Sequence, residues 1–129
     1  MTVFKNISVK DALKLAYEGK AYLYDMREKA SYIKGHLPTA ENVPKEAVEE
    51  QIKRIRRGKN RSILIVLYCD YGNRSMYLAK ELEEKGYEQI ASMVGGYHAY
   101  EGYVEAKKNA LWTMEWKEGG KLSFSWKRE

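Results

Sequence analysis

With 129 residues, the chain is long enough for one domain with a real hydrophobic core but not for two, so a single functional site is expected. It is 44% hydrophobic, with only 2 prolines and no repeat or low-complexity stretch, which excludes a largely disordered or repetitive protein. A net charge of +5 is modest and identifies no partner by itself.

What the sequence lacks narrows the class of protein further. Residues 1–6 contain no basic region followed by an apolar core, and no window approaches the roughly eighteen apolar residues of a membrane span. The only cysteine, Cys69, cannot form an internal disulfide, and with 2 histidines it cannot complete an ordinary zinc site. We therefore expect a soluble, cytoplasmic protein without metal or cofactor. In it the Cys69 thiol either packs as an inert side chain in the core or takes part in a reaction.

The first half of the chain alternates helix and strand signals. Ser8–Asp11 has the Ser-x-x-acid form of a helix cap, and Gly19 ends the helical spacing that follows. Residues 21–25 are apolar and aromatic without a helical stripe, which predicts a strand. Residues 32–44 are rich in turn formers, with a short strand predicted at 40–43.

The second half continues the alternation. Pro44 suits the first turn of a helix that ends at Gly58, and residues 62–68 form the continuous aliphatic run of a strand buried on both faces. The elements predicted after it, in chain order, are a helix at 76–85, a strand at 90–94 and a helix at 97–107. This order predicts an α/β fold, a parallel sheet of about five strands with helices on both faces.

The last residues have a different pattern. Trp112, Met114 and Trp116 alternate before a turn at 117–120, and Leu122, Phe124 and Trp126 alternate after it, which predicts a β-hairpin. An isolated hairpin is marginal in water, so we expect it to pack on the domain or on a partner. We accordingly divide the chain into a domain at residues 1–108 and a C-terminal extension at residues 109–129.

Cys69 lies where chemistry is expected in such a fold. It directly follows the most strand-like segment and precedes a helix, and sites in open α/β sheets lie beyond the carboxyl ends of strands. A helix N-terminus and neighbouring cations lower the pKa of a thiol and make it reactive. Gly72 and Asn73 tolerate unusual backbone angles, so successive N–H groups can turn toward the sulfur, with Arg74 and Ser75 opening the helix.

Two motifs carry a resemblance to a known family. Residues 69–75, Cys-Asp-Tyr-Gly-Asn-Arg-Ser, resemble the active-site loop of rhodanese-family sulfurtransferases. Upstream, Asp25-Met26-Arg27 and residues 35–44, Gly-His-Leu-Pro-Thr-Ala-Glu-Asn-Val-Pro, resemble the family's second signature. Residues 86–87 and 94–97 also match, so the resemblance extends over about residues 3–107 and implies a rhodanese-like fold.

The resemblance implies sulfur transfer through a persulfide on Cys69, from a donor such as thiosulfate or a small-molecule or protein persulfide to a thiol or protein acceptor. Backbone N–H groups of residues 70–75 would hold the charge on the sulfur. The implied substrate-binding residues are Asp70, Tyr71, Gly72, Asn73, Arg74, Ser75 and Arg27. Asp70 places a negative charge beside the nucleophile, which weighs against dianionic thiosulfate as the natural donor.

Several of these side chains have a second interpretation. Arg74 either contacts an anionic donor or pairs with a nearby carboxylate. Arg27 either faces the mouth that holds Cys69 or, the favoured interpretation, forms an ion pair between strand-end loops, where Asp25 anchors the backbone. His36 and His98 are assigned structural or surface positions. The basic run 53–61 is favoured as a solvated helix end over a docking surface for nucleic acid or an acidic protein.

Two other functions are weighed against sulfur transfer. Some cell-cycle phosphatases share the fold, but their loop is one residue longer than the four residues that separate Cys69 from Arg74, and no acid for the leaving group is evident. A non-enzymatic rhodanese-like binding or regulatory module is the other alternative, which an intact cysteine loop disfavours. The chain is expected to be a monomer or a homodimer.

Overall fold

The structure, a computed structural model, describes residues 5–58 and 62–117. Within these residues, strands and helices alternate along most of the chain. In order they are β1 (Lys5–Ile7), α1 (Val9–Tyr17), β2 (Ala21–Asp25), α2 (Lys29–Lys34), β3 (Glu41–Asn42), α3 (Lys45–Arg56), β4 (Leu64–Tyr68), α4 (Asn73–Glu84), β5 (Ile90–Met93) and α5 (Gly96–Lys117).

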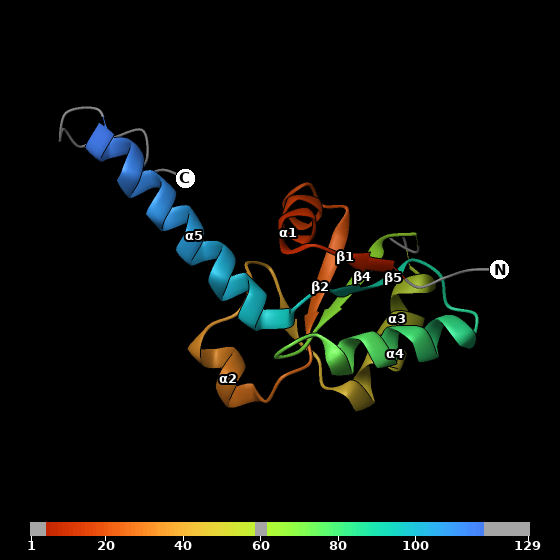
Figure 1. The fold of residues 1–129 in the computed structure, drawn as a ribbon. Helices are drawn as coiled ribbons and strands as arrows, with labels where there is room; N and C mark the ends of the chain where they lie inside the picture. The colour runs from red at the N-terminus through yellow and green to blue at the C-terminus, as the bar shows by residue number, and fades with distance from the viewer. Residues whose placement is uncertain (1–4, 59–61, 118–129) are drawn as a thin grey trace.

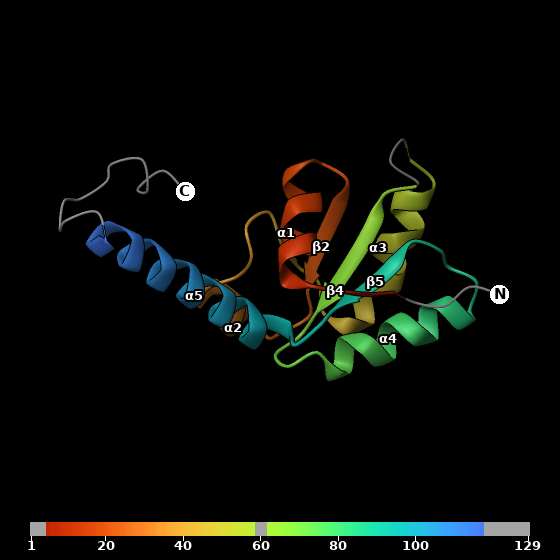
Figure 2. The ribbon, with the colours of Figure 1, turned by 45° about the horizontal axis from the view of Figure 1, so that its top comes forward.

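The strands form one parallel sheet in the order β1-β5-β4-β2-β3. Figure 2 shows β2, β4 and β5 side by side, with β4 between the other two. The register places Leu23 opposite Val66 and Val66 opposite Ala91. The predicted parallel sheet of five strands is therefore confirmed, and its most apolar strand is the central one, because only a central strand is covered on both faces.

Helices cover both faces of this sheet (Figure 1). Ile65 and Leu67 of β4 belong to a core cluster with buried residues of α3 and α4. Val66 and Tyr68, which alternate with them, belong to a second cluster with residues of α1 and α5. Successive residues of a strand point to opposite faces, so one short run of the sequence contributes to both halves of the core.

The helix signals were accurate where they combined a cap with apolar spacing. The Ser8 hydroxyl accepts the Asp11 N–H at 3.1 Å and caps α1 as predicted. Two elements were not predicted, β1 and α2. The first has three residues, and the second has six, no side-chain cap and no buried residue, so neither leaves a periodic apolar pattern in the sequence.

The predicted hairpin is wrong in its first half. Trp112, Met114 and Trp116 lie in α5, which runs unbroken to Lys117 and across the proposed boundary at 108. Between Gly102 and Lys117 the sequence has neither glycine nor proline, and extending an existing helix costs less than starting a new pair of strands. The second half, Leu122 to Trp126, lies outside the described residues, and the division at 108 stays a prediction.

Helix α5 is also the longest element, with 22 residues. Its first turns pack on the sheet through Tyr97, Ala99, Tyr100 and Tyr103, and its later turns extend away from it (Figure 1). Despite this length, none of the described helices is apolar enough to cross a membrane.

Candidate active site

Cys69 is the first residue after β4, at the carboxyl edge of the sheet. Asp25 ends β2 at the same edge, and β5 ends there at Met93. Because all strands are parallel, the loops that follow them meet at this edge, where α/β proteins place their sites. The segment from Cys69 to Gly72 then leads directly into α4.

The Cys69 sulfur is surrounded by hydrogen-bond donors. The backbone N–H of Gly72 lies 3.2 Å from Sγ and that of Ser75 lies 3.4 Å from it. The protonated thiol itself donates to the Ser75 hydroxyl oxygen at 3.5 Å. The side chain is buried, with 2% of its surface exposed. The predicted turn of backbone N–H groups toward the sulfur is thus confirmed for Gly72 and Ser75.

These contacts determine the acidity of the thiol. Burial has the largest single influence and raises the pKa of Cys69, because it disfavours the anion. Hydrogen bonds from the Ser75 hydroxyl and from the backbone N–H groups of Ser75, Gly72 and Arg74 favour the anion, and together they outweigh burial. The pKa of Cys69 therefore lies below its ordinary value, which increases the thiolate fraction at neutral pH.

The start of α5 holds the cysteine loop from the other side. The N–H of Tyr97 donates to the Cys69 carbonyl at 2.8 Å, and the N–H of His98 donates to the Asp70 carbonyl at 3.0 Å. The first N–H groups of a helix have no partner within the helix, so these bonds satisfy them with loop carbonyls. The loop is consequently fixed between the beginnings of two helices, α4 and α5.

This close approach requires glycine at two positions. Gly72 has φ +99° and Gly96 has φ +62°, a region that other residues rarely adopt. A Cβ on Gly72 would lie 2.9 Å from the Gly95 nitrogen, and one on Gly96 would lie 2.5 Å from the Cys69 carbonyl oxygen. The backbone path around the sulfur therefore depends on residues on both sides of the loop.

The remaining residues of the loop face solvent. Arg74 Nη2 lies 4.0 Å from Asp70 Oδ2, and both side chains are more than half exposed. Tyr71 is 68% exposed and tilts against the His98 ring at 5.3 Å between centroids. Asn73 is exposed at the first position of α4. The structure thus contains one of the two alternatives for Arg74, the carboxylate pairing, in a loose and solvated form that does not bury its charge, and contact with an anionic donor stays a prediction.

Arg27 has a different environment from the other predicted ligands. Its Nε and Nη2 lie 3.0 Å and 2.7 Å from the two Asp25 carboxylate oxygens, and Nη2 also donates to the Gly35 carbonyl at 2.7 Å. Its guanidinium is stacked over the Tyr97 ring at 3.8 Å, and only 5% of the residue is exposed. An ion pair was the favoured interpretation, but it forms with Asp25 within the same strand-end loop rather than between loops, and a role for Arg27 in substrate binding stays a prediction.

Sequence reasoning missed one residue that reaches this site. Ser92 on β5 lies with its hydroxyl oxygen 2.8 Å from Ser75 Oγ, and it is 1% exposed. The contact joins residues 17 positions apart through the pairing of β5 with β4. The one available signal was a hydroxyl side chain in the middle of an otherwise apolar strand.

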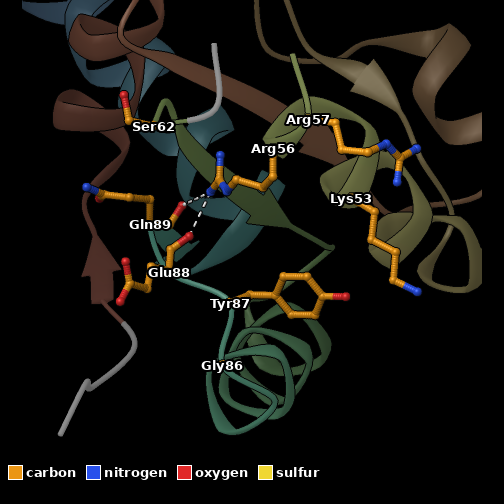
Figure 3. A pocket seen from close by; sticks show the side chains of 8 residues that line it. All are labelled: Lys53, Arg56, Arg57, Ser62, Gly86, Tyr87, Glu88 and Gln89. Atoms are coloured by element: carbon orange, nitrogen blue, oxygen red, sulfur yellow. Dashed lines mark hydrogen bonds between the residues drawn. The ribbon is translucent and has the colours of Figure 1, made fainter. Parts of the chain in front are cut away.

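The basic run lies at the opposite edge of the sheet, where β4 and β5 begin. Figure 3 shows a pocket of about 480 Å³ there, lined by Lys53, Arg56 and Arg57 and by residues 62 and 86–89. The Arg56 guanidinium donates to the carbonyls of Ile63, Glu88 and Gln89 at 3.0, 2.7 and 3.3 Å. Arg56 therefore ties the end of α3 to the sheet, in agreement with a helix end, and Lys59 and Arg61 lie outside the described residues.

The fold and the loop agree with a comparison of the sequence with protein families. The model of the rhodanese-like domain matches residues 8–103. The match covers most of the chain, which therefore belongs to the rhodanese-like domain family.

Solved structures support the same fold. Reduced CoADR-RHD of Bacillus anthracis superposes with a TM-score of 0.62 and 23% identity over 75% of this chain, which spans 16% of that larger protein. A Rhodopseudomonas palustris protein of unknown function, a possible tyrosine phosphatase, superposes with a TM-score of 0.66 and 23% sequence identity. The match covers 78% of this chain and 81% of that protein. A human single-domain sulfurtransferase superposes with a TM-score of 0.57 and 22% sequence identity. The match covers 76% of this chain and 96% of that protein. At these identities the likeness establishes the fold alone.

Proposed function

We propose that this protein is a rhodanese-type sulfurtransferase or sulfur carrier that holds sulfane sulfur as a persulfide on Cys69. The observation that carries the proposal is the set of donors at the sulfur, the N–H groups of Gly72 and Ser75 at 3.2 and 3.4 Å. Neutral donors that converge on one buried sulfur favour its anion, and the thiolate is the form that attacks another sulfur. The likeness to a human single-domain sulfurtransferase agrees with this activity.

The reaction has two steps. The Cys69 thiolate attacks the outer sulfur of the donor, an S–S bond forms at Sγ, and the bond within the donor breaks with its electron pair on the leaving sulfite or thiolate. An acceptor thiolate then attacks the outer sulfur of the persulfide, and the electron pair of the broken bond returns to Sγ. The N–H groups of the loop stabilise the negative charge at the start and at the end of this cycle.

Intact-mass measurement tests the proposal directly. After incubation with thiosulfate or a small-molecule persulfide and removal of excess donor, the wild-type chain is expected to gain one sulfur atom, which a thiol acceptor then removes. Cys69→Ser, which lacks the nucleophile, is the matched control and should keep its mass. Failure of the wild type to gain sulfur from any of these donors would contradict the proposal, and turnover of aryl phosphates that depends on Cys69 would favour a phosphatase.

Donor preference gives a second prediction, because Asp70 is exposed beside the nucleophile. Asp70→Asn is expected to raise kcat/KM for thiosulfate about fivefold at low salt, since one unit charge at about 4 Å in water contributes about 1 kcal/mol. The gain should shrink as salt is added. A neutral persulfide donor should show little change, because it carries no charge for Asp70 to repel.

Glu84→Gln is the matched control for this experiment. It removes the same charge from the exposed last residue of α4, roughly 16 Å along the helix from its first turn, where a unit charge in water contributes only about a quarter of its energy at about 4 Å even without screening by salt. Equal gains in Asp70→Asn and Glu84→Gln would assign the effect to net charge rather than to the mouth of the site.

A further inference from the structure

Ser92 contributes a buried hydroxyl to the environment of the sulfur. It lies on β5 between Leu67 of β4 and Asn6 of β1 in the register of the sheet. Within the described part of the chain, the hydrogen-bond partner of its side chain is Ser75 Oγ, at 2.8 Å. Buried hydroxyl groups are almost always hydrogen-bonded, so the Ser92 hydroxyl either donates its proton to Ser75 Oγ or accepts the Ser75 proton.

The direction of that hydrogen bond matters because the Ser75 hydroxyl has one proton and three neighbours. They are Ser92 Oγ at 2.8 Å, the Gly72 carbonyl oxygen at 3.3 Å and Cys69 Sγ at 3.5 Å. If the proton points to Ser92 or to Gly72, the sulfur faces the lone pairs of Ser75, which favours the protonated thiol. If Ser92 donates instead, the Ser75 proton is free to point at the sulfur, which favours the anion.

We propose that Ser92 is a positioning residue of this site, whose hydroxyl donates to Ser75 Oγ and so directs the Ser75 proton to Cys69 Sγ when the sulfur is negatively charged. The chain Ser92, Ser75, Cys69 then consists of two hydrogen bonds that point the same way. Both serines are at most 1% exposed, so water does not compete for either proton. The importance of this chain for sulfur transfer rests on the proposed function, but its effect on the thiol does not.

The chain acts at two moments of the proposed cycle. Before the first step it stabilises the thiolate that attacks the donor. In the second step the S–S bond of the persulfide breaks, its electron pair goes to Sγ, and the same two hydrogen bonds stabilise Cys69 as the leaving group. Between these moments the negative charge is on the outer sulfur, and the Ser75 proton can turn to the Gly72 carbonyl.

The test is the pH dependence of Cys69 alkylation by iodoacetamide, a neutral reagent that reacts with the thiolate. In Ser92→Ala the midpoint is expected to move to higher pH by about 0.5 to 1, the amount that one hydrogen bond of ordinary strength supplies. Ser75→Ala, which removes the group that touches the sulfur, should move it at least as far. In the Ser75→Ala background, Ser92→Ala should add nothing, because its effect passes through Ser75.

Ser92→Thr supplies the conservative variant, since it keeps the hydroxyl and should keep the wild-type midpoint. An unchanged midpoint in Ser92→Ala would overturn the proposal. So would an equal shift from Ser92→Ala with and without Ser75, or a shift as large in Ser92→Thr, which would assign the effect to packing. The alkylation assay needs neither donor nor acceptor, so these outcomes are independent of the mass experiment on sulfur loading.

Discussion

Replacing Asp25 with alanine is expected to lower the free energy of unfolding by about 3–5 kcal/mol, because it leaves the Arg27 guanidinium buried without its counter-ion. Asp25 is fully buried and Arg27 is 5% exposed. The Asp25 carboxylate also accepts the Tyr68 O–H at 2.8 Å and the Arg27 backbone N–H at 2.9 Å. With Arg27 Nε and Nη2, the substitution therefore removes the acceptor of four donor atoms at the carboxyl edge of the sheet.

Urea unfolding of purified variants measures this effect. Asp70→Asn is the matched control, because it breaks an exposed ion pair at 4.0 Å, where a loss of less than about 1 kcal/mol is expected. The double variant Asp25→Ala with Arg27→Met removes both buried charges and should be more stable than Asp25→Ala alone. A loss for Asp25→Ala no larger than that of the exposed control would contradict the role assigned to the buried pair.

Gly96→Ala is expected to disturb the chemistry at Cys69 strongly, because the added methyl group meets the backbone of the cysteine loop. The new Cβ would lie 2.5 Å from the Cys69 carbonyl oxygen and 2.7 Å from the Asp70 carbonyl carbon and oxygen, at a φ of +62°. These are backbone atoms of the loop, so the clash can be relieved only by moving the loop or the start of α5. Displacing a catalytic group by about 1 Å can cost a hundredfold in rate, and we expect a loss of sulfur transfer of that order.

Gly102→Ala is the control, because it adds the same methyl group to the same helix. Apart from its chain neighbours and the nearby backbone of its own helix, no described atom lies within 4 Å of its Cβ position, and alanine in a helix is about 1 kcal/mol more favourable than glycine. Gly102→Ala should therefore keep wild-type alkylation and be slightly more stable. Wild-type alkylation of Cys69 and wild-type sulfur transfer in folded Gly96→Ala would show that the loop does not depend on this contact.

The sequence predicted the sheet and the cysteine loop because both leave local signals. A continuous aliphatic run is typical of the central strand, and the loop between it and α4 has a recognisable order of residues. The tail misled because its signal is ambiguous. Trp112 and Trp116 alternate with Met114 as in a strand, but they are also four apart, which fits one face of a helix equally well.

The sequence predicted only those contacts of the site that join residues close together along the chain. Gly72 and Ser75 are within six residues of Cys69, and their contact with the sulfur follows from one turn of backbone. Ser92 reaches the same site only because β5 lies beside β4 in the sheet, which no short motif encodes. Two interpretations of Arg27 stay open from the sequence, because a strand-end position alone does not determine whether its side chain forms an ion pair between loops or faces the mouth of the site.

The donors at the Cys69 sulfur also determine how this loop tolerates change over evolution. Two of them are backbone N–H groups, which no replacement other than proline removes as long as the chain keeps its path. The residues between and beside them, Asp70, Tyr71, Asn73 and Arg74, are exposed. Under the proposed function, much of the reactivity is therefore encoded in the main chain and its glycines, while the exposed side chains can vary and select different donors and acceptors without removing these two hydrogen bonds.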